Sequence, residues 1–153
     1  MQIFPNVGIV YLSFHSDRHL PDFVSALKNM SYPKDRAVVY IVDNPHPEYG
    51  NSMRTIDESV MLLSGKEIPV VRVFPQTENT GFDKGNNIGV QAALADGCEY
   101  VFFHNDDGFF GRECLENMIE AMQADESIGL AQALILLHPD THLVNTSGNA
   151  FHY

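Results

Sequence analysis

Short apolar runs alternate with segments of helical spacing four times along this chain, which constrains its fold more than any other feature. The apolar runs cover residues 7–14, 37–42, 69–74 and 100–103. The helical segments cover residues 20–30, 53–63 and 115–122, and a further one begins within residues 77–87 and ends at residue 95. Continuous apolar runs are typical of strands covered on both faces, and strands alternating with helices form βαβ units. We therefore expect an α/β fold with a mainly parallel sheet and helices on both faces.

A further apolar run, residues 128–137 (IGLAQALILL), predicts a fifth strand. Pro21 suits the first turn of the first helix, and Gly97 is expected to end the third. The 153 residues have the length of one ordinary domain, and no repeat or linker divides the sequence. We expect a single domain over residues 1–153.

Polar clusters follow the predicted strands at the ends where a parallel sheet binds its ligands. They are residues 13–15, Asp43 with Asn44, residues 79–85, and residues 105–108. Because the carboxyl ends of parallel strands share one edge of the sheet, these clusters are expected to meet there.

The strongest of these clusters is Asn105, Asp106 and Asp107. Adjacent carboxylates repel each other unless they are solvated or bound to a cation. Mg²⁺ or Mn²⁺ takes oxygens from one or two carboxylates and completes its shell with water and phosphate oxygens, so it can neutralise a departing diphosphate. The alternative is a hairpin turn, since Asp-Gly stands between two pairs of phenylalanines. The helical segment that follows favours a site with Asp106 and Asp107 as metal ligands.

Residues 79–89 (NTGFDKGNNIG) form a second cluster with glycines at positions 81, 85 and 89. Gly81 would let the backbone approach a ligand, the helix N-terminus would offer N–H groups to an anion, and Lys84 would add a cation. The alternative is a loop and helix cap, with Gly89 present for close packing of the helix on a strand. By itself this segment favours the structural interpretation.

Asp43 closes the second strand, where a carboxylate can accept hydrogen bonds from a nucleobase or a ribose hydroxyl. Turn chemistry explains Asp-Asn-Pro equally well. A dinucleotide-binding dehydrogenase would need G-x-G-x-x-G at the first strand–helix turn, and residues 13–17 contain no glycine. The sequence also lacks the H-E-x-x-H, Cys/His zinc and G-x-S-x-G patterns.

Charge and cysteine content limit the partners and the compartment. The formal net charge is −11, from 20 acidic and 9 basic residues, which argues against a nucleic-acid partner. An anionic ligand would need a metal, a helix N-terminus or a local cation. Two cysteines point to a reducing cytoplasm. No apolar stretch reaches the roughly 18 residues that span a bilayer, so no transmembrane segment is expected.

In the order and spacing of these segments the sequence resembles the family 2 glycosyltransferases of the GT-A (Rossmann-like) fold, especially rhamnosyltransferase-like members. The matching segments are VGIVYLSFHS, IVDNP, NTGFDKGNNIG, YVFFHNDDGFF and GLAQALILLHPDTHLVNTSG. The resemblance implies that Ser13 and Phe14 lie beside the nucleotide and that Asp43 contacts its base or ribose. It also implies that the backbone around Gly81, with Lys84 nearby, shapes the donor pocket.

The resemblance places Asn105, Asp106 and Asp107 on the D-x-D motif of the family. Asp107 would bind the divalent metal, and Asp106 would face the ribose or sugar. Asn105 replaces the first Asp of the motif, which weakens the expectation of a bidentate, strongly metal-retaining site.

The same resemblance implies inverting, metal-dependent transfer of a sugar from a nucleotide-diphosphate donor to a hydroxyl of a saccharide or lipid-linked acceptor. Such a role fits polysaccharide biosynthesis in the cytoplasm, including peripheral association with the inner membrane face. The general base of the family lies later in the catalytic domain and is expected beyond Tyr153. This chain is therefore expected to be the front, donor-binding part of a longer domain. The alternatives are an inactive nucleotide-binding module and a sugar-nucleotide nucleotidyltransferase.

Overall fold

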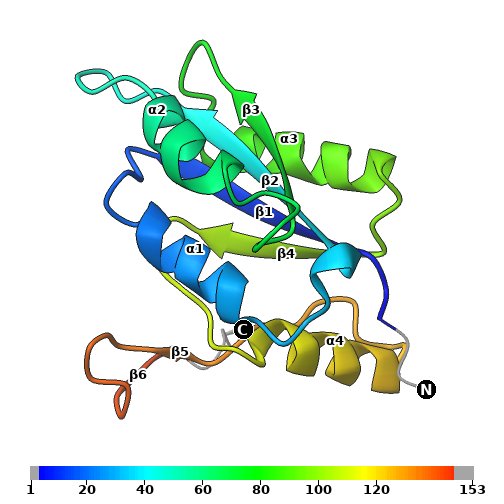
Figure 1. The fold of residues 1–153 in the computed structure, drawn as a ribbon. Coiled ribbons are helices and arrows are strands. Elements are labelled where there is room, and N and C mark those ends of the chain that lie inside the picture. Colours follow the sequence, from blue (N-terminus) through cyan, green and yellow to red (C-terminus); the bar gives the residue numbers. More distant parts are fainter. Residues whose placement is uncertain (1–3, 147–153) are drawn as a thin grey trace, which may run out of the picture.

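Four parallel strands form the centre of the protein (Figure 1). The computed structural model describes residues 4–146. The strands lie in the order β3-β2-β1-β4, and their bounds are β1 Val7–Phe14, β2 Ala37–Asn44, β3 Val70–Pro75 and β4 Tyr100–Asn105. The helical elements are α1 Leu20–Asn29, η1 Lys34–Arg36, α2 Met53–Thr55, η2 Ile56–Met61, α3 Gly81–Ala95 and α4 Cys114–Ala124. The predicted α/β fold with a mainly parallel sheet is confirmed.

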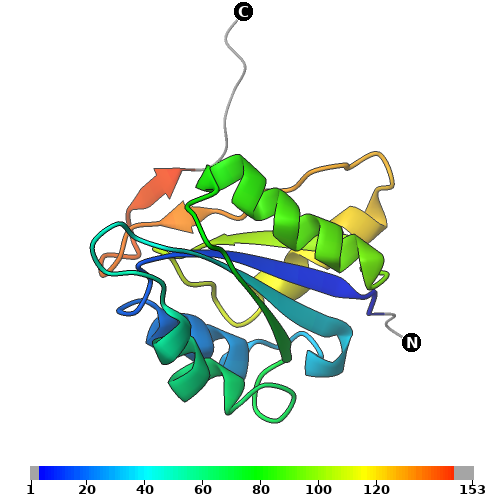
Figure 2. The same cartoon turned by 90° about the horizontal axis from the view of Figure 1, so that it is seen from above.

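Helices cover both faces of the sheet, as the continuous apolar strands require. Figure 2 shows α3 on one face and α1 with α2 on the other. On the α1 face, Val7, Ile9 and Tyr11 of β1 belong to one buried cluster with side chains of α1, η2 and α4. On the α3 face, Val10 of β1 packs with Ala93 of α3. Successive residues of β1 therefore pack into two cores, which is why the strand contains no charged residue.

Small residues spaced by four let α3 approach β1 closely. A Cβ added to Gly89 would lie 2.6 Å from Val10 Cγ1, and one added to Gly85 would lie 2.5 Å from Leu12 Cδ1. The strand contributes Gly8, where an added Cβ would lie 2.6 Å from the Cβ of Ala93. Gly89 thus has the packing role foreseen as the structural alternative for this segment.

We expect Gly89→Ala to lower the free energy of unfolding by about 1–2 kcal/mol. Alanine gains about 1 kcal/mol in helix propensity, but overpacking costs about 1–3 kcal/mol. Strain should prevail because the stiff Val10 side chain also has Cγ2 only 3.1 Å from the added carbon. Urea unfolding would measure the change. Gly111→Ala, where an added Cβ meets nothing within 4 Å, is the control and should show no loss.

The fifth strand predicted at residues 128–137 is wrong as a member of the main sheet. Only β5, Ile135–Leu136, is extended and paired, and it pairs antiparallel with β6, Val144–Thr146, in a separate two-stranded sheet. Leucines of this segment are exposed, Leu130 to 87%. An apolar run becomes a buried strand only where partner strands and a covering layer exist, and within residues 4–146 this run has only the short strand β6 beside it and stays exposed.

Two features of the sequence resemblance fall on residues 147–153, outside the described part of the chain. One is Ser147 and Gly148, which complete the matching NTSG segment. The other is Tyr153, beyond which the general base of the family is expected. The position of the base therefore stays a prediction.

The other helix boundaries follow their sequence signals. Pro21 lies in the first turn of α1, and Gly97, with φ of 78°, follows the end of α3. The predicted second helix is irregular, because α2 continues as the π-helical segment η2. No helix among residues 4–146 is both long and apolar enough to cross a membrane.

Candidate functional site at the carboxyl edge of the sheet

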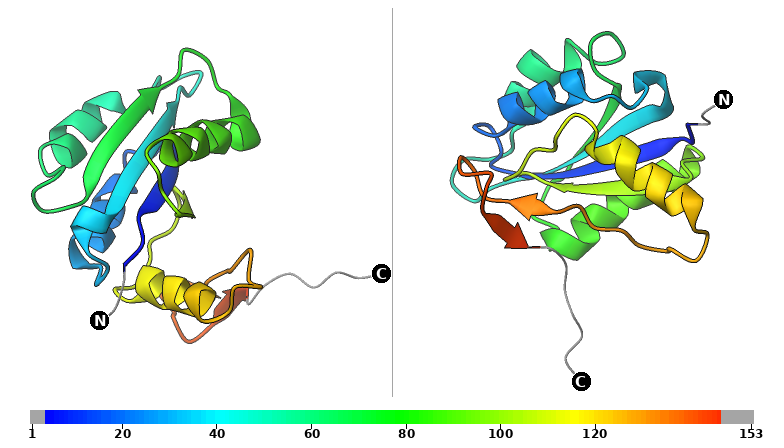
Figure 3. Two further views of the ribbon diagram at one scale, coloured as in Figure 1. Left: turned by 90° about the vertical axis from the view of Figure 1, so that its right-hand side faces the viewer. Right: turned by 90° about the horizontal axis from the view of Figure 1, so that it is seen from below.

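The order of the strands places the topological switch point of the sheet between the carboxyl ends of β1 and β4, which we call the β1–β4 edge. From β1 the chain builds outward through β2 to β3, and then α3 returns it to β4 on the other side of β1 (Figures 1 and 3). α/β proteins bind ligands at such a point, beside the loops that follow the two central strands. The register aligns Ser13 with Asp43 and Leu12 with Asn105, so the ends of β1, β2 and β4 are adjacent.

Asp106 is bonded directly to the loop after β1. Its Oδ2 accepts hydrogen bonds from Ser16 Oγ, at 2.8 Å, and from the backbone N–H of Phe14, at 3.2 Å. Asp106 and Asp107 form a turn that leads on to α4, so the hairpin alternative is wrong. Asp106 therefore joins the loop after β4 to the loop after β1.

Asp107 is exposed, and within the described part of the chain its carboxylate has no hydrogen bond or ion pair. Asp106 has only one of its two oxygens engaged by residues 4–146. No group of three or more His, Cys, Asp or Glu side chains within this range is arranged to hold a metal by itself. The oxygen donors of Asp106 and Asp107 do fit Mg²⁺ or Mn²⁺, which uses one or two carboxylates together with water and phosphate oxygens.

Asp43 is fully buried, at 0% exposure, and both its oxygens are engaged. Oδ1 accepts from Ser13 Oγ at 2.7 Å, and Oδ2 accepts from the N–H of Ser52 at 2.9 Å. Burial raises the pKa of this carboxyl above its usual range, against the lowering effect of the two hydrogen bonds. In this arrangement Asp43 organises Ser13 and Ser52, and direct contact with a nucleotide would require the surrounding loops to open. Its predicted contact with base or ribose stays a prediction.

Two buried serines link the loops of the site, and sequence reasoning assigned no role to either. Ser16 Oγ lies 3.1 Å from Ser13 Oγ, and the N–H of Ser16 donates to Ser52 Oγ at 3.2 Å. Ser52 in turn donates to Asp17, which also accepts a short hydrogen bond from Thr55. A serine in a polar loop has no periodicity that reveals burial, so the sequence holds no signal for these contacts.

Gly81 and Lys84 lie at the start of α3, next to the end of β2. Asn44 Oδ1 accepts from both the N–H and the hydroxyl of Thr80, at 3.1 and 2.9 Å, and so ties the helix start to the carboxyl edge. Gly81 has φ of 76° and open space around its α-carbon. Lys84 is exposed and forms no hydrogen bond or ion pair with residues 4–146. The structure therefore joins Ser13, Asp43 and Asp106 in one network and leaves Lys84 outside it.

Aromatic rings surround the start of this loop. The rings of Phe14 and His46 lie 5.1 Å apart, those of His46 and Tyr49 lie 4.7 Å apart, and His15 stacks on Tyr49 at 4.5 Å. His15 has φ of 56°, a left-handed conformation that is uncommon for residues other than glycine. Backbone strain of this kind concentrates at functional sites.

His104 lies beneath the site, two residues before Asp106 on β4. It is 7% exposed, and its ring packs against Phe23 at 4.8 Å and Phe110 at 5.4 Å. Burial lowers the pKa of His104 to about 4, although the nearby acidic turn opposes this shift. Its Nδ1 has no hydrogen-bond partner among residues 4–146. A neutral imidazole therefore supports the turn that carries Asp106.

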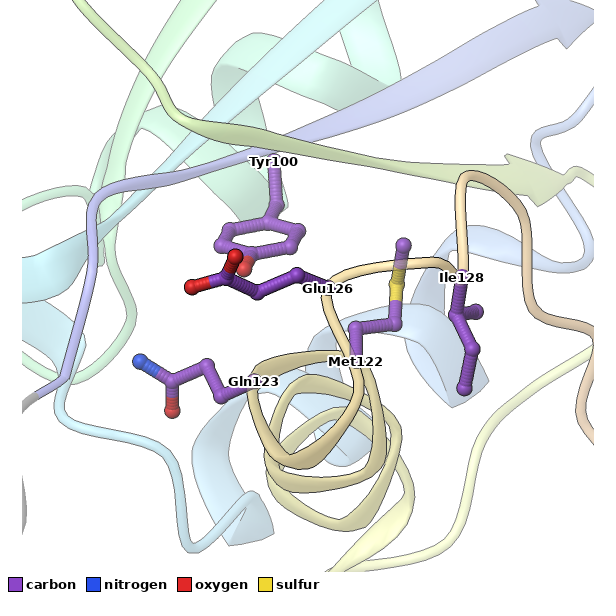
Figure 4. A pocket seen from close by; sticks show the side chains of 5 residues that line it. All are labelled: Tyr100, Met122, Gln123, Glu126 and Ile128. Atoms are coloured by element: carbon purple, nitrogen blue, oxygen red, sulfur yellow. The ribbon is translucent and has the colours of Figure 1, made fainter.

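A hollow of about 390 Å³ lies at the opposite end of the sheet and does not belong to this site. Figure 4 shows Tyr100, Gln123 and Glu126 around it, together with Met122 and Ile128. Tyr100 begins β4, whereas Asp106 follows its end, so the length of that strand separates the hollow from the candidate site.

The sequence matches the family described as "Glycosyl transferase family 2" over residues 14–136. The chain belongs to glycosyl transferase family 2. Membership agrees with the family resemblance of its motifs. The matched range begins at Phe14, at the end of β1, and contains Asp43, Gly81, Lys84, Asp106 and Asp107. Comparison with curated proteins gives no match.

Solved structures of glycosyltransferases share this fold. A Pyrobaculum calidifontis mannosyltransferase, solved with GDP-Man and Mn²⁺, has a TM-score of 0.74 and 17% identity over 92% of this chain and 38% of its own. S. aureus TarS 1-349 has a TM-score of 0.65 and 17% identity over 79% of this chain and 33% of its own. TarS 1-349 with UDP-GlcNAc aligns with a TM-score of 0.64 and 16% identity, over 84% of this chain and 38% of its own. This family 2 chain thus spans little more than a third of these proteins.

Proposed function

We propose that this chain is the donor-binding part of a glycosyltransferase that moves a sugar from a nucleotide-diphosphate sugar to an acceptor hydroxyl. The observation that carries the proposal is Asp106, bonded to Ser16 and to the Phe14 amide at the β1–β4 edge, with Asp107 exposed beside it. Family membership supports transfer of a sugar rather than of a nucleotide. Two structures with the same fold were solved with nucleotide sugars, UDP-GlcNAc and GDP-Man.

We propose metal dependence for an electrostatic reason. A diphosphate that binds at the β1–β4 edge would approach the carboxylates of Asp106 and Asp107, in a chain of net charge −11. Like charges at close range repel by several kcal/mol where water is excluded, so a cation between the two partners is needed. Asp107 would hold Mn²⁺ or Mg²⁺ with help from Asp106, and the bound ion would offset the charge that develops on the departing diphosphate.

The remaining residues of the β1–β4 edge would bind the donor. Phe14 would lie beside the nucleotide, and so would Ser13 once the loops that bury it open, with Asp43 holding Ser13 in place for this contact. Gly81 and Lys84, at the start of α3, would bound the side of the pocket nearest β2. Inversion at the anomeric carbon, a saccharide or lipid-linked acceptor and the rhamnosyltransferase-like subtype are parts of the proposal that rest on the sequence resemblance.

The general base is proposed to lie beyond Tyr153, in a later part of a longer catalytic domain. We therefore expect the 153-residue chain to bind donors and to transfer sugar poorly or not at all. Cytoplasmic location and peripheral membrane association likewise stay predictions from the sequence.

A thermal-shift panel tests the donor-binding proposal. UDP, GDP, dTDP and their sugars are added separately, with and without Mn²⁺. We expect one nucleotide, at 100 times its Kd, to add about 2.7 kcal/mol of stability with Mn²⁺, which raises the Tm by roughly 5–10 °C. The nucleobase that responds identifies the donor subclass. Absence of any shift with every nucleotide, with and without Mn²⁺, would contradict the proposal. A shift that does not depend on Mn²⁺ would support nucleotide binding and contradict the proposed metal dependence.

A further inference from the structure

The hydroxyl of Ser16 stands at the centre of the hydrogen bonds between the loops after β1 and β4. It lies 2.8 Å from Asp106 Oδ2 and 3.1 Å from Ser13 Oγ, and it accepts the N–H of Phe14 at 3.0 Å. Ser16 is 0% exposed. A hydroxyl with three polar neighbours in a dry site has its rotamer fixed by the protein rather than by solvent.

The hydroxyl proton of Ser16 can go to Ser13 Oγ or to Asp106 Oδ2, the two acceptors within hydrogen-bond distance. Ser13 gives its own proton to Asp43, at 2.7 Å, so its oxygen could accept from Ser16. The carboxylate of Asp106 is nearer and charged, and hydrogen bonds to ionised acceptors are roughly twice as strong as those between neutral groups. The proton of Ser16 therefore goes to Asp106.

The backbone of Ser16 is fixed on both sides, which holds this hydroxyl in place. Its N–H donates to Ser52 Oγ, and its carbonyl accepts from the N–H groups of His19, at 2.8 Å, and Leu20, at 3.1 Å. The left-handed conformation of His15 turns the chain so that Ser16 Oγ can also bind the Phe14 amide. The left-handed conformation of His15 thus helps to orient the Ser16 hydroxyl toward Asp106.

We propose that Ser16 is a positioning residue for the metal: its hydroxyl holds the Asp106 carboxylate in the orientation that a divalent cation requires. This inference rests on the proposed function. One oxygen of Asp106 is bound by Ser16 and the Phe14 amide, and the other has no hydrogen bond with residues 4–146 and is available to the ion. Groups that hydrogen-bond a ligating carboxylate fix its geometry, and their loss typically weakens metal binding about 10–100-fold.

Titration of Mn²⁺, followed by the EPR signal of the free ion, tests this role. It is carried out on the full chain, alone and with UDP, GDP or dTDP. We expect Ser16→Ala to raise the Kd for Mn²⁺ about tenfold or more. Thr55→Val is the matched control, because it removes a nearby hydroxyl that binds Asp17 and not Asp106. Circular dichroism verifies that each variant is folded.

A double-mutant cycle with Asp106→Asn separates positioning from a general structural effect. If Ser16 acts through the Asp106 carboxylate, Ser16→Ala will have little further effect on the Kd for Mn²⁺ in the Asp106→Asn background. An equal effect in both backgrounds, or an unchanged Kd in Ser16→Ala, overturns the inference. Failure of the unaltered chain to bind Mn²⁺ under every condition would instead reject the metal-binding proposal, and this inference with it.

Discussion

Asp107→Ala should raise the Kd for Mn²⁺ at least about 100-fold and remove the Mn²⁺-dependent part of nucleotide stabilisation. Loss of a group that only supports a metal ligand costs about 10–100-fold in affinity, so loss of a ligand itself should cost at least the upper value. Asp107 is exposed and forms no hydrogen bond with residues 4–146. The substitution should therefore leave the free energy of unfolding without ligand nearly unchanged, as surface substitutions do.

The control for Asp107→Ala is Glu126→Ala, which removes the same charge at the far end of the sheet beside the hollow of Figure 4. A general effect of net charge on cation binding would appear in both variants, whereas a ligand role would appear in Asp107→Ala alone. Thermal shifts with nucleotide, measured with and without Mn²⁺, give the comparison. An undiminished Mn²⁺ increment in Asp107→Ala would remove this residue from the site.

Asp106 and Asp107 have different roles in the proposed site. Asp106 is bonded to the β1 loop and so has a structural role as well, whereas Asp107 has no such contact within residues 4–146. Two adjacent carboxylates of which one has no protein partner lower stability unless a cation or water balances them. That pattern is the physical reason to expect Asp107 to be the main metal ligand, and Asp106 to join the two loops through one oxygen and to offer the other to the metal.

The sheet and the edge that carries the site could be predicted from the sequence because both follow from periodicity. Apolar runs without alternation required a sheet covered on both faces, and parallel strands bring their carboxyl ends to one edge. The prediction of a fifth strand at residues 128–137 failed because periodicity reports apolar content and does not show whether the main sheet offers a neighbouring strand. In the structure only Ile135 and Leu136 of that run are paired.

The internal connections of the site could not be predicted, because they depend on loop conformation. The left-handed backbone of His15 aims Ser16 at Asp106, and no sequence signal marks a histidine for that conformation. The full burial of Asp43 was also unforeseen, since a carboxylate at a strand end is usually solvated. Its burial depends on Ser52, nine residues further along the chain, whose amide reaches Oδ2.

We expect the free energy of unfolding of the unaltered chain to fall by about 3 kcal/mol between pH 7 and pH 4 because of His104, and we expect His104→Phe to abolish this fall. In the folded state the pKa of His104 is about 4 because the ring is buried, while an unfolded chain has the ordinary value of about 6.5. Between these values the unfolded state binds the proton and the folded state does not. Stability is therefore complete above about pH 6.5 and declines as the pH falls toward 4. A loss of about 3 kcal/mol is a large share of the roughly 5–15 kcal/mol that stabilises a domain.

Phenylalanine is the suitable replacement because the ring of His104 lies among Tyr11, Phe23, Phe102 and Phe110, and its Nδ1 has no partner to lose. Urea unfolding of both proteins at pH 7, 5.5 and 4 gives the difference in free energy at each pH. Other acid-sensitive groups, such as Asp17 with its lowered pKa, affect both proteins equally and cancel in that difference. The variant should match or exceed the unaltered chain at pH 7, lead by about 1.4 kcal/mol at pH 5.5, and lead by about 3 kcal/mol at pH 4. A difference that stays constant with pH would show that the imidazole titrates normally, and that the turn bearing Asp106 does not rest on a neutral ring.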